Sequence, residues 1–474
     1  MSLVLFNDLT RKKEEFTPIT PGQVSFYSCG PTVYDYFHIG NARPFIVFDV
    51  LRRWLEHEGY KVKFVQNFTD IDDKMIHRAH QENITVPELA ERFINEYNKD
   101  ADALGIHKPD VAPRATDHIP EIINTISRII ANGHAYESNG DVYFDVRSWP
   151  KYGSLCKQNL EDLESGARVQ PGEKKKDPLD FALWKAEKPG EPSWDSPWGK
   201  GRPGWHIECS AMSSKYLGDN IDIHSGGVDL MFPHHENEAA QSEAASNSGR
   251  PFVNYWLHNG FLLIDSEKMS KSLGNFLTAR AALQKYNPLA LRFFMLSAHY
   301  RSPINFTTES LEQAEAGVMR LRNCLSDLDF AAENRVSESS DFNVEKFDSQ
   351  LKELDSQFSD SMNDDFNTAA AIGILFDVVH LINTSLKENE TLPAEFFNLA
   401  KKYLADYDKI LGVIGSDDNE SDSESKEIEA LIQERTQARK AKNFARSDEI
   451  RDMLKSRGII LEDTPQGTKW KREI

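Results

Sequence analysis

A strand, a helix and a second strand follow one another between residues 24 and 69, and this stretch constrains the fold of the 474-residue chain most. Residues 24–28 form a short apolar run typical of a buried strand, and residues 61–66 alternate polar and apolar side chains as a second strand does. Between them, apolar residues recur at helical spacing before a glycine that predicts the end of the helix: Phe45, Phe48, Leu51, Leu55 and then Gly59. The pattern predicts a βαβ unit.

The ligand of such a unit usually binds where the strands end and the helix begins. The sequence His38-Ile39-Gly40-Asn41 lies at that position. Because the N-terminus of a helix favours negative charge, we expect an anionic group to bind there. Four residues are also what an ordinary capped helix start contains, so this motif alone does not decide the function.

A second motif lies in the other half of the chain. The sequence Glu267-Lys268-Met269-Ser270-Lys271-Ser272 follows a strand-like apolar run at residues 260–264 and places two lysines on a loop flanked by serine and glycine. The two motifs, in this order, resemble the HIGH and KMSKS signatures of class I aminoacyl-tRNA synthetases. The surrounding residues resemble the cysteinyl-tRNA synthetases over nearly the whole chain.

This resemblance implies a ligase that activates L-cysteine with ATP to cysteinyl-adenylate and transfers it to the 3′-terminal ribose of cysteine tRNA. It implies an α/β fold: a Rossmann-type domain split by an insertion, then a helical bundle and a small anticodon-binding module. By analogy with the family we expect a monomer.

Composition narrows the class of protein further. No apolar run reaches 18 residues, and the first ten residues lack a basic start followed by an apolar segment, which predicts a cytoplasmic protein without a membrane partner. A net charge of −20 argues against indiscriminate nucleic-acid binding but leaves room for a local basic surface that contacts RNA. Four cysteines in so long a chain do not make a disulfide framework: Cys29, Cys156, Cys209 and Cys324.

A zinc site is predicted from the resemblance rather than from spacing. Zinc prefers thiolate, imidazole and carboxylate ligands, but a lone cysteine is usually a small buried hydrophobe, and a histidine and a glutamate four apart usually form a surface hydrogen bond. The resemblance implies one zinc ion per chain, with Cys156 and Cys324 outside the site and His235 as a possible outer ligand. The implied ligands are Cys29, Cys209, His234 and Glu238.

The zinc ion gives a physical reason for substrate selection. Cysteine and serine differ only by sulfur for oxygen, and the shape of an apolar pocket separates such isosteres poorly. A soft metal that accepts the substrate thiolate discriminates against a hydroxyl. The predicted insertion at residues 118–204 is too short to hold a separate editing domain, which agrees with selection by the metal.

The resemblance also assigns the phosphate-binding groups. His38 and Asn41 are expected to donate to the phosphates of ATP, while Lys268 and especially Lys271 close over them and Mg²⁺ bridges the leaving phosphates. Asn41 stands where the signature has its second histidine, and an amide donates a hydrogen bond but carries no charge. A role for Asn41 in proton transfer is therefore not expected.

Further contacts are predicted around these groups. The ATP-binding set is completed by Gly40, Gly226, Gly227 and Asp229, although a plain tight turn would contain the same two adjacent glycines. Gly30, Thr69 and Trp205 are expected to border the amino acid. The three aspartates near Thr69, at positions 70, 72 and 73, are compatible either with a metal site or with a capped helix start.

The remaining pattern predicts the domain order. Asn139-Gly140 between alternating residues predicts a hairpin, a helical apolar pattern at residues 369–382 predicts a bundle, and residues 416–427 read as an acidic flexible linker. The C-terminal residues, with more basic than acidic side chains and with Trp470 between two lysines, suit single-stranded RNA. The predicted segments are 1–117 and 205–260 (two halves of the Rossmann domain), 118–204 (insertion), 261–308 (KMSKS loop and stem contact), 309–414 (bundle), 415–427 (linker) and 428–474 (anticodon module).

Two alternatives share these motifs. A related ligase that joins cysteine to an aminosugar in mycothiol synthesis would have the same core and zinc but no tRNA-reading tail, and residues 428–474 argue against it. A non-catalytic RNA-binding descendant of a synthetase would be expected to lack His38 or the lysine loop, and the sequence contains both.

Overall fold

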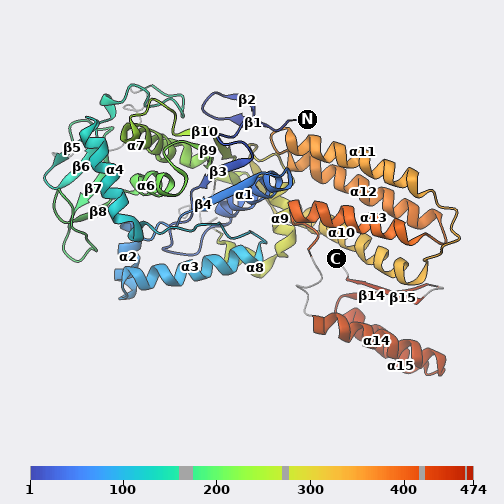
Figure 1. Cartoon of the computed structure of the whole chain (residues 1–474). Coiled ribbons are helices and arrows are strands. Elements are labelled where there is room, and N and C mark those ends of the chain that lie inside the picture. Colours follow the sequence, from blue (N-terminus) through green and yellow to red (C-terminus); the bar gives the residue numbers. More distant parts are fainter. Residues whose placement is uncertain (1, 160–174, 269–276, 416–421, 465–466, 473–474) are drawn as a thin grey trace. The chain divides into compact units, whose positions relative to one another are not determined.

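The computed structural model describes residues 2–159, 175–268, 277–415, 422–464 and 467–472 (Figure 1). The chain divides into two compact units, which are described separately. The first comprises Met1–Tyr286, Ala298–Phe306 and Met362–Asn367, and the second comprises Asn287–Ser297, Thr307–Ser361 and Thr368–Ile474.

A parallel four-stranded sheet forms the centre of the first unit, with strand order β10-β9-β3-β4. The strands are β3 (Gln23–Ser28), β4 (Lys61–Gln66), β9 (Ile221–Gly227) and β10 (Val253–Asn259). Helix α1 (Ile39–His57) connects β3 to β4, and α7 (Glu236–Ser246) lies between β9 and β10 in the chain. The chain therefore leaves β3 in one direction and β9 in the other, which confirms the predicted βαβ unit and the split α/β sheet.

Helix α1 is held by its apolar face. Phe48, Leu51 and Leu55 are fully buried, and burial of each such side chain contributes about 1.5–3 kcal/mol. The helix ends at His57, just before the predicted stop at Gly59, whose φ of +87° turns the chain while the N–H of Tyr60 donates to the carbonyl of Leu55.

Two helices and a hairpin surround this sheet. Helix α2 (Asp73–Glu82) is capped by Asp72, whose carboxylate accepts the N–H of Met75 at 2.7 Å, so the capped-helix interpretation applies to Asp72. Helix α3 (Val86–Ala103) begins with a capping box, and the strands β1 (Val4–Asn7) and β2 (Lys12–Glu15) pair antiparallel.

The insertion forms its own antiparallel sheet, ordered β5-β6-β7-β8. Asn139 and Gly140 both have positive φ between β5 and β6, as the predicted hairpin requires. Helices α4 and α6 pack against the sheet around a core that includes Ile126, Phe144 and Trp184. The elements are α4 (Ile119–Ala131), β5 (Ala135–Ser138), β6 (Asp141–Phe144), β7 (Phe181–Ala186), β8 (Gly201–Pro203) and α6 (Trp205–Leu217).

A three-stranded sheet follows β10, with β11 (Leu262–Ile264) paired to β12 (Glu267–Lys268) on one side and to β13 (Ile304–Phe306) on the other. Helix α8 (Ala279–Lys285) comes after residues 269–276. Lys271 lies outside the described residues, and for Lys268 only the backbone is described.

Helices dominate the second unit. Its bundle contains α9 (Pro288–Leu296), α10 (Thr308–Asn334), α11 (Val344–Asn363), α12 (Thr368–Glu388) and α13 (Ala394–Leu411). Ile372, Leu375, Val379 and Ile382 of α12 are buried, as the predicted apolar pattern requires. Helix α12 is also long and apolar enough to cross a membrane by length and composition alone, but a core helix of a bundle passes the same test.

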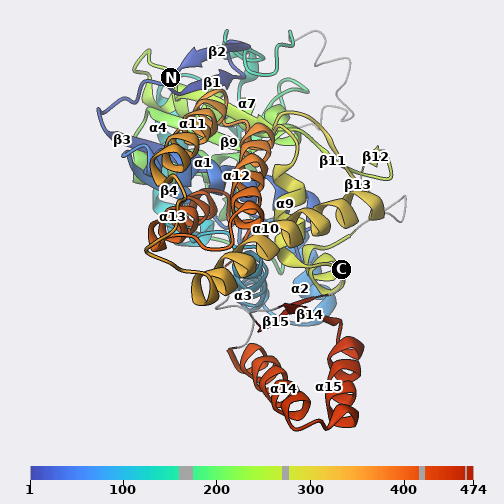
Figure 2. The ribbon, with the colours of Figure 1, turned by 90° about the vertical axis from the view of Figure 1, so that its right-hand side faces the viewer.

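The C-terminal module consists of α14 (Asp422–Lys440), α15 (Phe444–Ser456), and the antiparallel strands β14 (Ile459–Thr464) and β15 (Gly467–Arg472). Figure 2 shows α14 and α15 beside one another in this module. The predicted linker is corrected here, because α14 begins at Asp422 and includes half of residues 416–427. Aspartate, serine and glutamate are typical of disordered linkers but are equally favoured at a helix N-terminus.

Candidate active site

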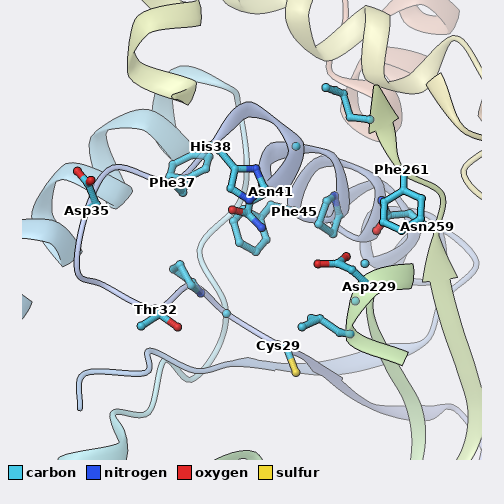
Figure 3. A pocket seen from close by; sticks show the side chains of 18 of the residues that line it. Cys29, Thr32, Asp35, Phe37, His38, Asn41, Phe45, Asp229, Asn259 and Phe261 are labelled. Atoms are coloured by element: carbon cyan, nitrogen blue, oxygen red, sulfur yellow. The ribbon is translucent and has the colours of Figure 1, made fainter. Parts of the chain in front are cut away.

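A cavity of about 330 Å³ lies where the central strands end and α1 begins (Figure 3). Cys29 and Gly30 follow β3, Gly226 and Gly227 end β9, and Asn259 ends β10. In open parallel sheets, ligands bind at the point where the strand order reverses, and here that point is between β3 and β9. The position of the cavity thus fits a nucleotide.

Most of the predicted contact residues line this cavity. They are Gly30, His38, Gly40, Asn41, Trp205, Gly226, Gly227 and Asp229. Thr69 does not line it: its side chain is buried, and its hydroxyl donates to Oε2 of Glu208 at 3.0 Å. Glu208 was not foreseen, because nothing in its local sequence distinguishes it from an ordinary first-turn glutamate of α6.

Backbone pairing attaches the chain on both sides of residues 269–276 to the cavity region. On the entry side, Lys268 pairs with Leu263 of β11. On the exit side, the N–H of Ile39 donates to the carbonyl of Leu277 at 2.9 Å, and the N–H of Ala279 donates to Phe37 at 2.8 Å. The chain therefore enters residues 269–276 from a strand paired with β11, whose first residue, Leu262, lines the cavity, and leaves them beside the first turn of α1.

Three glycines of the site have close neighbours that a side chain would displace. A Cβ on Gly30 would lie 1.6 Å from the carbonyl oxygen of Asn67, and one on Gly226 would lie 2.8 Å from the ring of His235. A Cβ on Gly227 would lie 2.4 Å from the Asp229 carboxylate. Gly226 and Gly227 are the last two residues of strand β9 and pair with His258 and Asn259 of β10, so they do not form the plain tight turn considered above.

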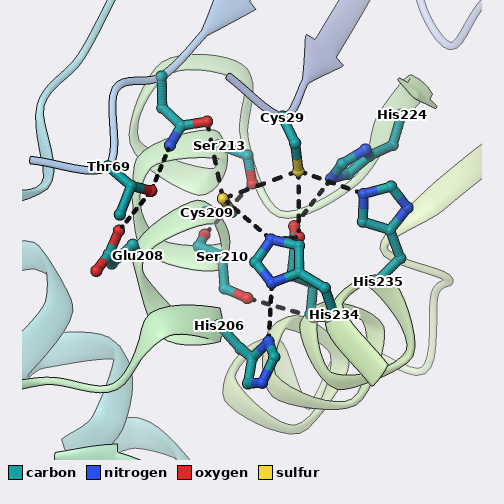
Figure 4. Close-up of polar contacts among 12 residues, drawn as sticks. Cys29, Thr69, His206, Glu208, Cys209, Ser210, Ser213, His224, His234 and His235 are labelled. Atoms are coloured by element: carbon teal, nitrogen blue, oxygen red, sulfur yellow. Dashed lines mark hydrogen bonds and ion pairs between the residues drawn. The ribbon is translucent and has the colours of Figure 1, made fainter. Parts of the chain in front are cut away.

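A cluster of metal-ligand side chains lies beside the cavity and shares Cys29 with it (Figure 4). The ligand atoms of Cys29, Cys209, His234 and Glu238 all lie within 4.8 Å of one another and are buried. Cys29 Sγ is 4.0 Å from Cys209 Sγ and 3.5 Å from Glu238 Oε1. His234 Nε2 is 3.6 Å from Cys209 Sγ and 2.8 Å from Glu238 Oε1. The structure therefore brings together all four predicted ligands.

These separations fit zinc. Bonds of about 2.0–2.3 Å to sulfur, nitrogen and oxygen place neighbouring ligand atoms about 3.3–3.8 Å apart in a tetrahedron. The three distances that involve sulfur lie within or close to this range, and only the His234–Glu238 contact is shorter. The donor set, two thiols with an imidazole and a carboxylate, is one that zinc accepts.

A second, overlapping group has compatible spacing: Cys29, His224, His235 and Glu238. His235 Nε2 lies 3.3 Å from Cys29 Sγ, and His224 Nε2 lies 2.8 Å from Glu238 Oε2. The resemblance suggests His235 as a possible outer ligand, whereas the sequence assigns no role to His224, a histidine inside the buried strand β9. A polar residue in such a strand was the available signal.

The histidines of the cluster are oriented by further partners. His206 Nδ1 lies 2.8 Å from His234 Nδ1, and His258 Nε2 lies 2.8 Å from His235 Nδ1. His258 in turn contacts Asp8 Oδ2 at 2.8 Å through its other ring nitrogen. Outer partners of this kind set the tautomer and orientation of metal-binding imidazoles.

Without a metal ion, the pKa shifts in the cluster favour the ionised, ligating forms of Cys209 and Glu238 but not the thiolate of Cys29 or the neutral imidazole of His234. The hydrogen bond from Cys29 lowers the pKa of Cys209 to about 6 against the effect of burial, while burial raises the pKa of Cys29 well above its usual value. Burial disfavours a charged His234, but Glu238 and Cys209 overcome it and raise its pKa to about 10. Burial likewise opposes ionisation of Glu238, yet its histidine neighbours hold its pKa well below the usual range.

Trp205 joins the cluster to the cavity. Its indole stacks on the His234 ring at 4.2 Å between centroids, lines the cavity and remains 40% exposed. A small ligand bound against Cys29 would therefore have an aromatic wall beside it.

Three family profiles match the chain. The profile described as "tRNA synthetases class I (C) catalytic domain" matches residues 15–316. One described as "DALR domain" matches residues 357–415, and one described as "Cysteinyl-tRNA ligase anticodon binding domain" matches residues 421–470.

Curated relatives match over the full length. The cysteine–tRNA ligase of Caldicellulosiruptor saccharolyticus is 55% identical over 468 residues, which cover 99% of each chain. That of Anoxybacillus flavithermus is 52% identical over 472 residues, which cover 100% of each chain. That of Clostridioides difficile is 53% identical over 472 residues, which cover 99% of each chain.

Solved structures with the same fold are more distant in sequence. Mycobacterium tuberculosis methionyl-tRNA synthetase in complex with methionyl-adenylate has a TM-score of 0.61 at 15% identity, covering 83% of this chain and 91% of that one. A LeuRS from Agrobacterium radiobacter, in a ternary complex with tRNA, has a TM-score of 0.59 at 12% identity, covering 85% of this chain and 86% of that one. These likenesses confirm the predicted fold class and concern the fold alone.

Proposed function

The chain belongs to the cysteine–tRNA ligase family of class I aminoacyl-tRNA synthetases, and from this membership we propose that it activates L-cysteine with ATP and transfers it to the terminal ribose of cysteine tRNA. One observation carries the proposal: a nucleotide-sized cavity at the strand ends shares Cys29 with a buried group of zinc-type ligands. An amino acid with a thiol side chain is the substrate that needs both.

We assign one zinc ion to Cys29, Cys209, His234 and Glu238. When bound, the ion supplies a soft Lewis acid that accepts a thiolate far better than a hydroxyl. Cys29 would place this selectivity at the cavity wall, and Trp205 would pack against the rest of the substrate and exclude water from it. Gly30 permits the close approach of the chains at that wall, and Thr69 would shape it from behind through Glu208.

In adenylate formation the substrate carboxylate attacks the α-phosphate of ATP, and pyrophosphate leaves. His38 and Asn41 would donate hydrogen bonds to the phosphates at the first turn of α1, where the helix dipole also favours negative charge. Gly40, Gly226 and Gly227 would give the nucleotide access to backbone, and Asp229 would accept the ribose hydroxyls.

Lys268 and Lys271 would neutralise the charge that develops on the phosphates. Support comes from the backbone pairing of the two flanks of their segment, one with β11, which begins at the cavity, and the other with the start of α1. Mg²⁺ is expected to accompany ATP. Asn41 would stabilise charge only by hydrogen bonding, because its amide cannot transfer a proton at neutral pH.

The second unit is assigned to tRNA. The DALR match and the anticodon-binding match support contact with the stem and the anticodon. We further propose, by analogy with the family, that the protein acts as a cytoplasmic monomer without a membrane partner. The segments 1–117, 118–204, 205–260, 261–308, 309–414 and 428–474 stay our proposed functional divisions.

Charging of a cysteine tRNA transcript tests the function. Zinc-replete protein is incubated with ATP, the transcript and labelled cysteine, with labelled serine in a parallel reaction. We expect cysteine to be attached and serine to be ignored. Pyrophosphate exchange without charging would instead indicate the aminosugar ligase, and failure of both reactions would indicate a non-catalytic RNA-binding protein.

A further inference from the structure

Arg43 lies on α1 two residues after Asn41, and its side chain is fully buried. Its guanidinium donates to three backbone carbonyl oxygens. Nη1 reaches Gly260 at 2.8 Å and Phe261 at 3.1 Å, and Nη2 reaches His299 at 3.3 Å. One side chain thus joins α1 to two other segments of the first unit.

The environment of this guanidinium is unusual for a buried charge. Within the part of the chain that the structure describes, Arg43 has no ion pair, and its buried Nε atom has no hydrogen-bond partner. Burial lowers the pKa of Arg43 to about 10, so the group still carries its charge at neutral pH. Because an unpaired buried charge is costly, a residue required only for stability would be expected to have a carboxylate partner.

Arg53, on the same helix, has such a partner. It is also buried, but its guanidinium contacts the carboxylate of Asp49 at 2.8 Å. Neither Arg53 nor Asp49 lines the cavity. Substitution of Arg53 therefore measures the general effect of losing a buried guanidinium from α1, and any additional effect of substituting Arg43 can be attributed to the cavity.

Two of the three carbonyls that Arg43 holds, those of Gly260 and Phe261, belong to residues that line the cavity. Gly260 and Phe261 form one wall of it and lead directly into β11, which pairs with β12 before the predicted lysine loop. Figure 3 shows Phe261 and Asn259 on the opposite side of the cavity from Phe37 and His38. Arg43 thus connects the side that carries His38 to the side that leads to Lys268.

The same wall is fixed from its other face by backbone contacts. The N–H of Gly260 donates to Tyr300 at 2.8 Å, and the N–H of Ile304 donates to Phe261 at 3.0 Å. A Cβ on Gly260 would lie 2.6 Å from the carbonyl oxygen of Arg301, so the two segments are in direct backbone contact. Arg43 is the side chain that fastens this pair of segments to α1.

We propose that Arg43 is a positioning residue for adenylate formation, which holds the wall of the nucleotide cavity and the strand before the lysine loop in register with the helix that carries His38 and Asn41. This inference rests on the proposed function. Lysine cannot substitute, because the bonds to Gly260, Phe261 and His299 need a planar fork with several N–H donors in fixed directions.

The test compares Arg43→Lys with Arg53→Lys in the full-length protein. We expect Arg43→Lys to lower the rate of cysteine-dependent pyrophosphate exchange about 100-fold and to raise the KM for ATP, since small misplacements of reacting groups have effects of this size. Zinc content and the KM for cysteine should stay unchanged. Arg53→Lys should lose about as much thermal stability as Arg43→Lys. Its exchange rate should nevertheless stay within about twofold of wild type, because this variant leaves the cavity geometry intact.

A second variant distinguishes the loss of the guanidinium hydrogen bonds from a general loss of packing around residue 43. In Arg43→Ala, free guanidinium ion, added well below denaturing concentrations, should restore part of the exchange rate, whereas it should not help Arg53→Ala. Equal kinetics in the two lysine variants at equal stability, or no rescue, would overturn the proposal.

Equilibrium binding of ATP to Arg43→Lys and Arg53→Lys tests the role of Arg43 without relying on the proposed catalytic activity. If wild-type protein catalyses no exchange, the proposed function fails. The positioning role of Arg43 would then still require weaker ATP binding in Arg43→Lys than in Arg53→Lys, and equal binding would refute it.

Discussion

Single side chains decide which of the two overlapping ligand groups would hold the proposed zinc ion. Cys29 and Glu238 belong to both groups, so the distinction lies between Cys209 with His234 and His224 with His235. The fully buried His224 contacts the far oxygen of Glu238, Oε2, while His234 contacts Oε1, the oxygen that also faces Cys29. This geometry favours His234 as the ligand and His224 as the residue that orients the carboxylate.

Replacement of each histidine tests this assignment. His234→Asn should lose zinc on gel filtration, because the site loses a ligand. His224→Asn should keep its zinc with an affinity reduced about 10- to 100-fold, the usual effect of removing an outer partner. Elemental analysis and chelator competition measure both, with circular dichroism to check folding. Zinc kept in His234→Asn and lost in His224→Asn would move the site to the other group.

For individual residues, the family resemblance predicts the group of zinc ligands, whereas the spacing of these residues in the sequence does not. Its four predicted ligands come from positions 29 to 238 of the chain, and no local pattern links them. His206 and His258 were missed for the same reason: each stands alone in its own element and acquires a partner only when the sheet and α6 assemble. The buried Arg43 left no signal either, since its partners are backbone carbonyls.

Helices and strands are predicted best where a periodic apolar pattern is followed by a residue that typically ends the element. The helix before Gly59 and the hairpin at Asn139-Gly140 were read correctly, because an apolar repeat or a strand alternation ends at a residue that favours positive φ. The start of α7 shows a limit of local signals. Proline is favoured in the first turn of a helix, so Pro233 favours a start near that residue, but regular helix begins only at Glu236, after a distorted turn in which Phe232 has extended backbone angles.

The close backbone contact between the segments that follow β3 and β4 requires a glycine at position 30. Gly30→Ala should lower the thermal stability markedly and abolish exchange activity, because the new Cβ would lie 1.6 Å from the carbonyl oxygen of Asn67 and only backbone movement can relieve that contact. Gly373→Ala in α12 is the control: nothing lies near its Cβ, and alanine should stabilise the helix by up to about 1 kcal/mol. Thermal unfolding measures both, and equal melting temperatures would contradict the packing argument.

Across the whole molecule, the split sheet and the order of catalytic, helical and anticodon-binding segments followed from the resemblance. Composition alone could not have supplied them, since an acidic, serine-rich stretch was read as linker where α14 begins. The division into two compact units was not predicted in full either, because Met362–Asn367 belongs to the first unit although it lies between two helices of the bundle. Such exchanges depend on tertiary contacts that leave no local pattern.

The C-terminal module offers a way to separate amino-acid activation from tRNA charging. Arg435, nearly buried on α14, donates to both carboxylate oxygens of Asp463 at 2.7 and 2.9 Å, and Arg439 donates to Asp463 as well. Hydrogen bonds from Arg435 hold the pKa of Asp463 well below its usual range. The stabilisation is therefore fully present above the unfolded-state pKa of about 3.9 and is lost as the pH falls toward the folded-state value.

Asp463→Asn removes this carboxylate at neutral pH and should loosen the packing of α14 on β14. We expect faster proteolysis within residues 422–472 and a higher KM for tRNA, with pyrophosphate exchange unchanged, because no described residue of the module lines the cavity. Asp448→Asn is the matched control: its ion pair with Arg451 at 3.0 Å lies on the exposed surface of α15, where such pairs contribute little. If the two variants charged tRNA equally well, Asp463 would have no part in holding the module, and if exchange fell with charging, the two activities would not be separable in this way.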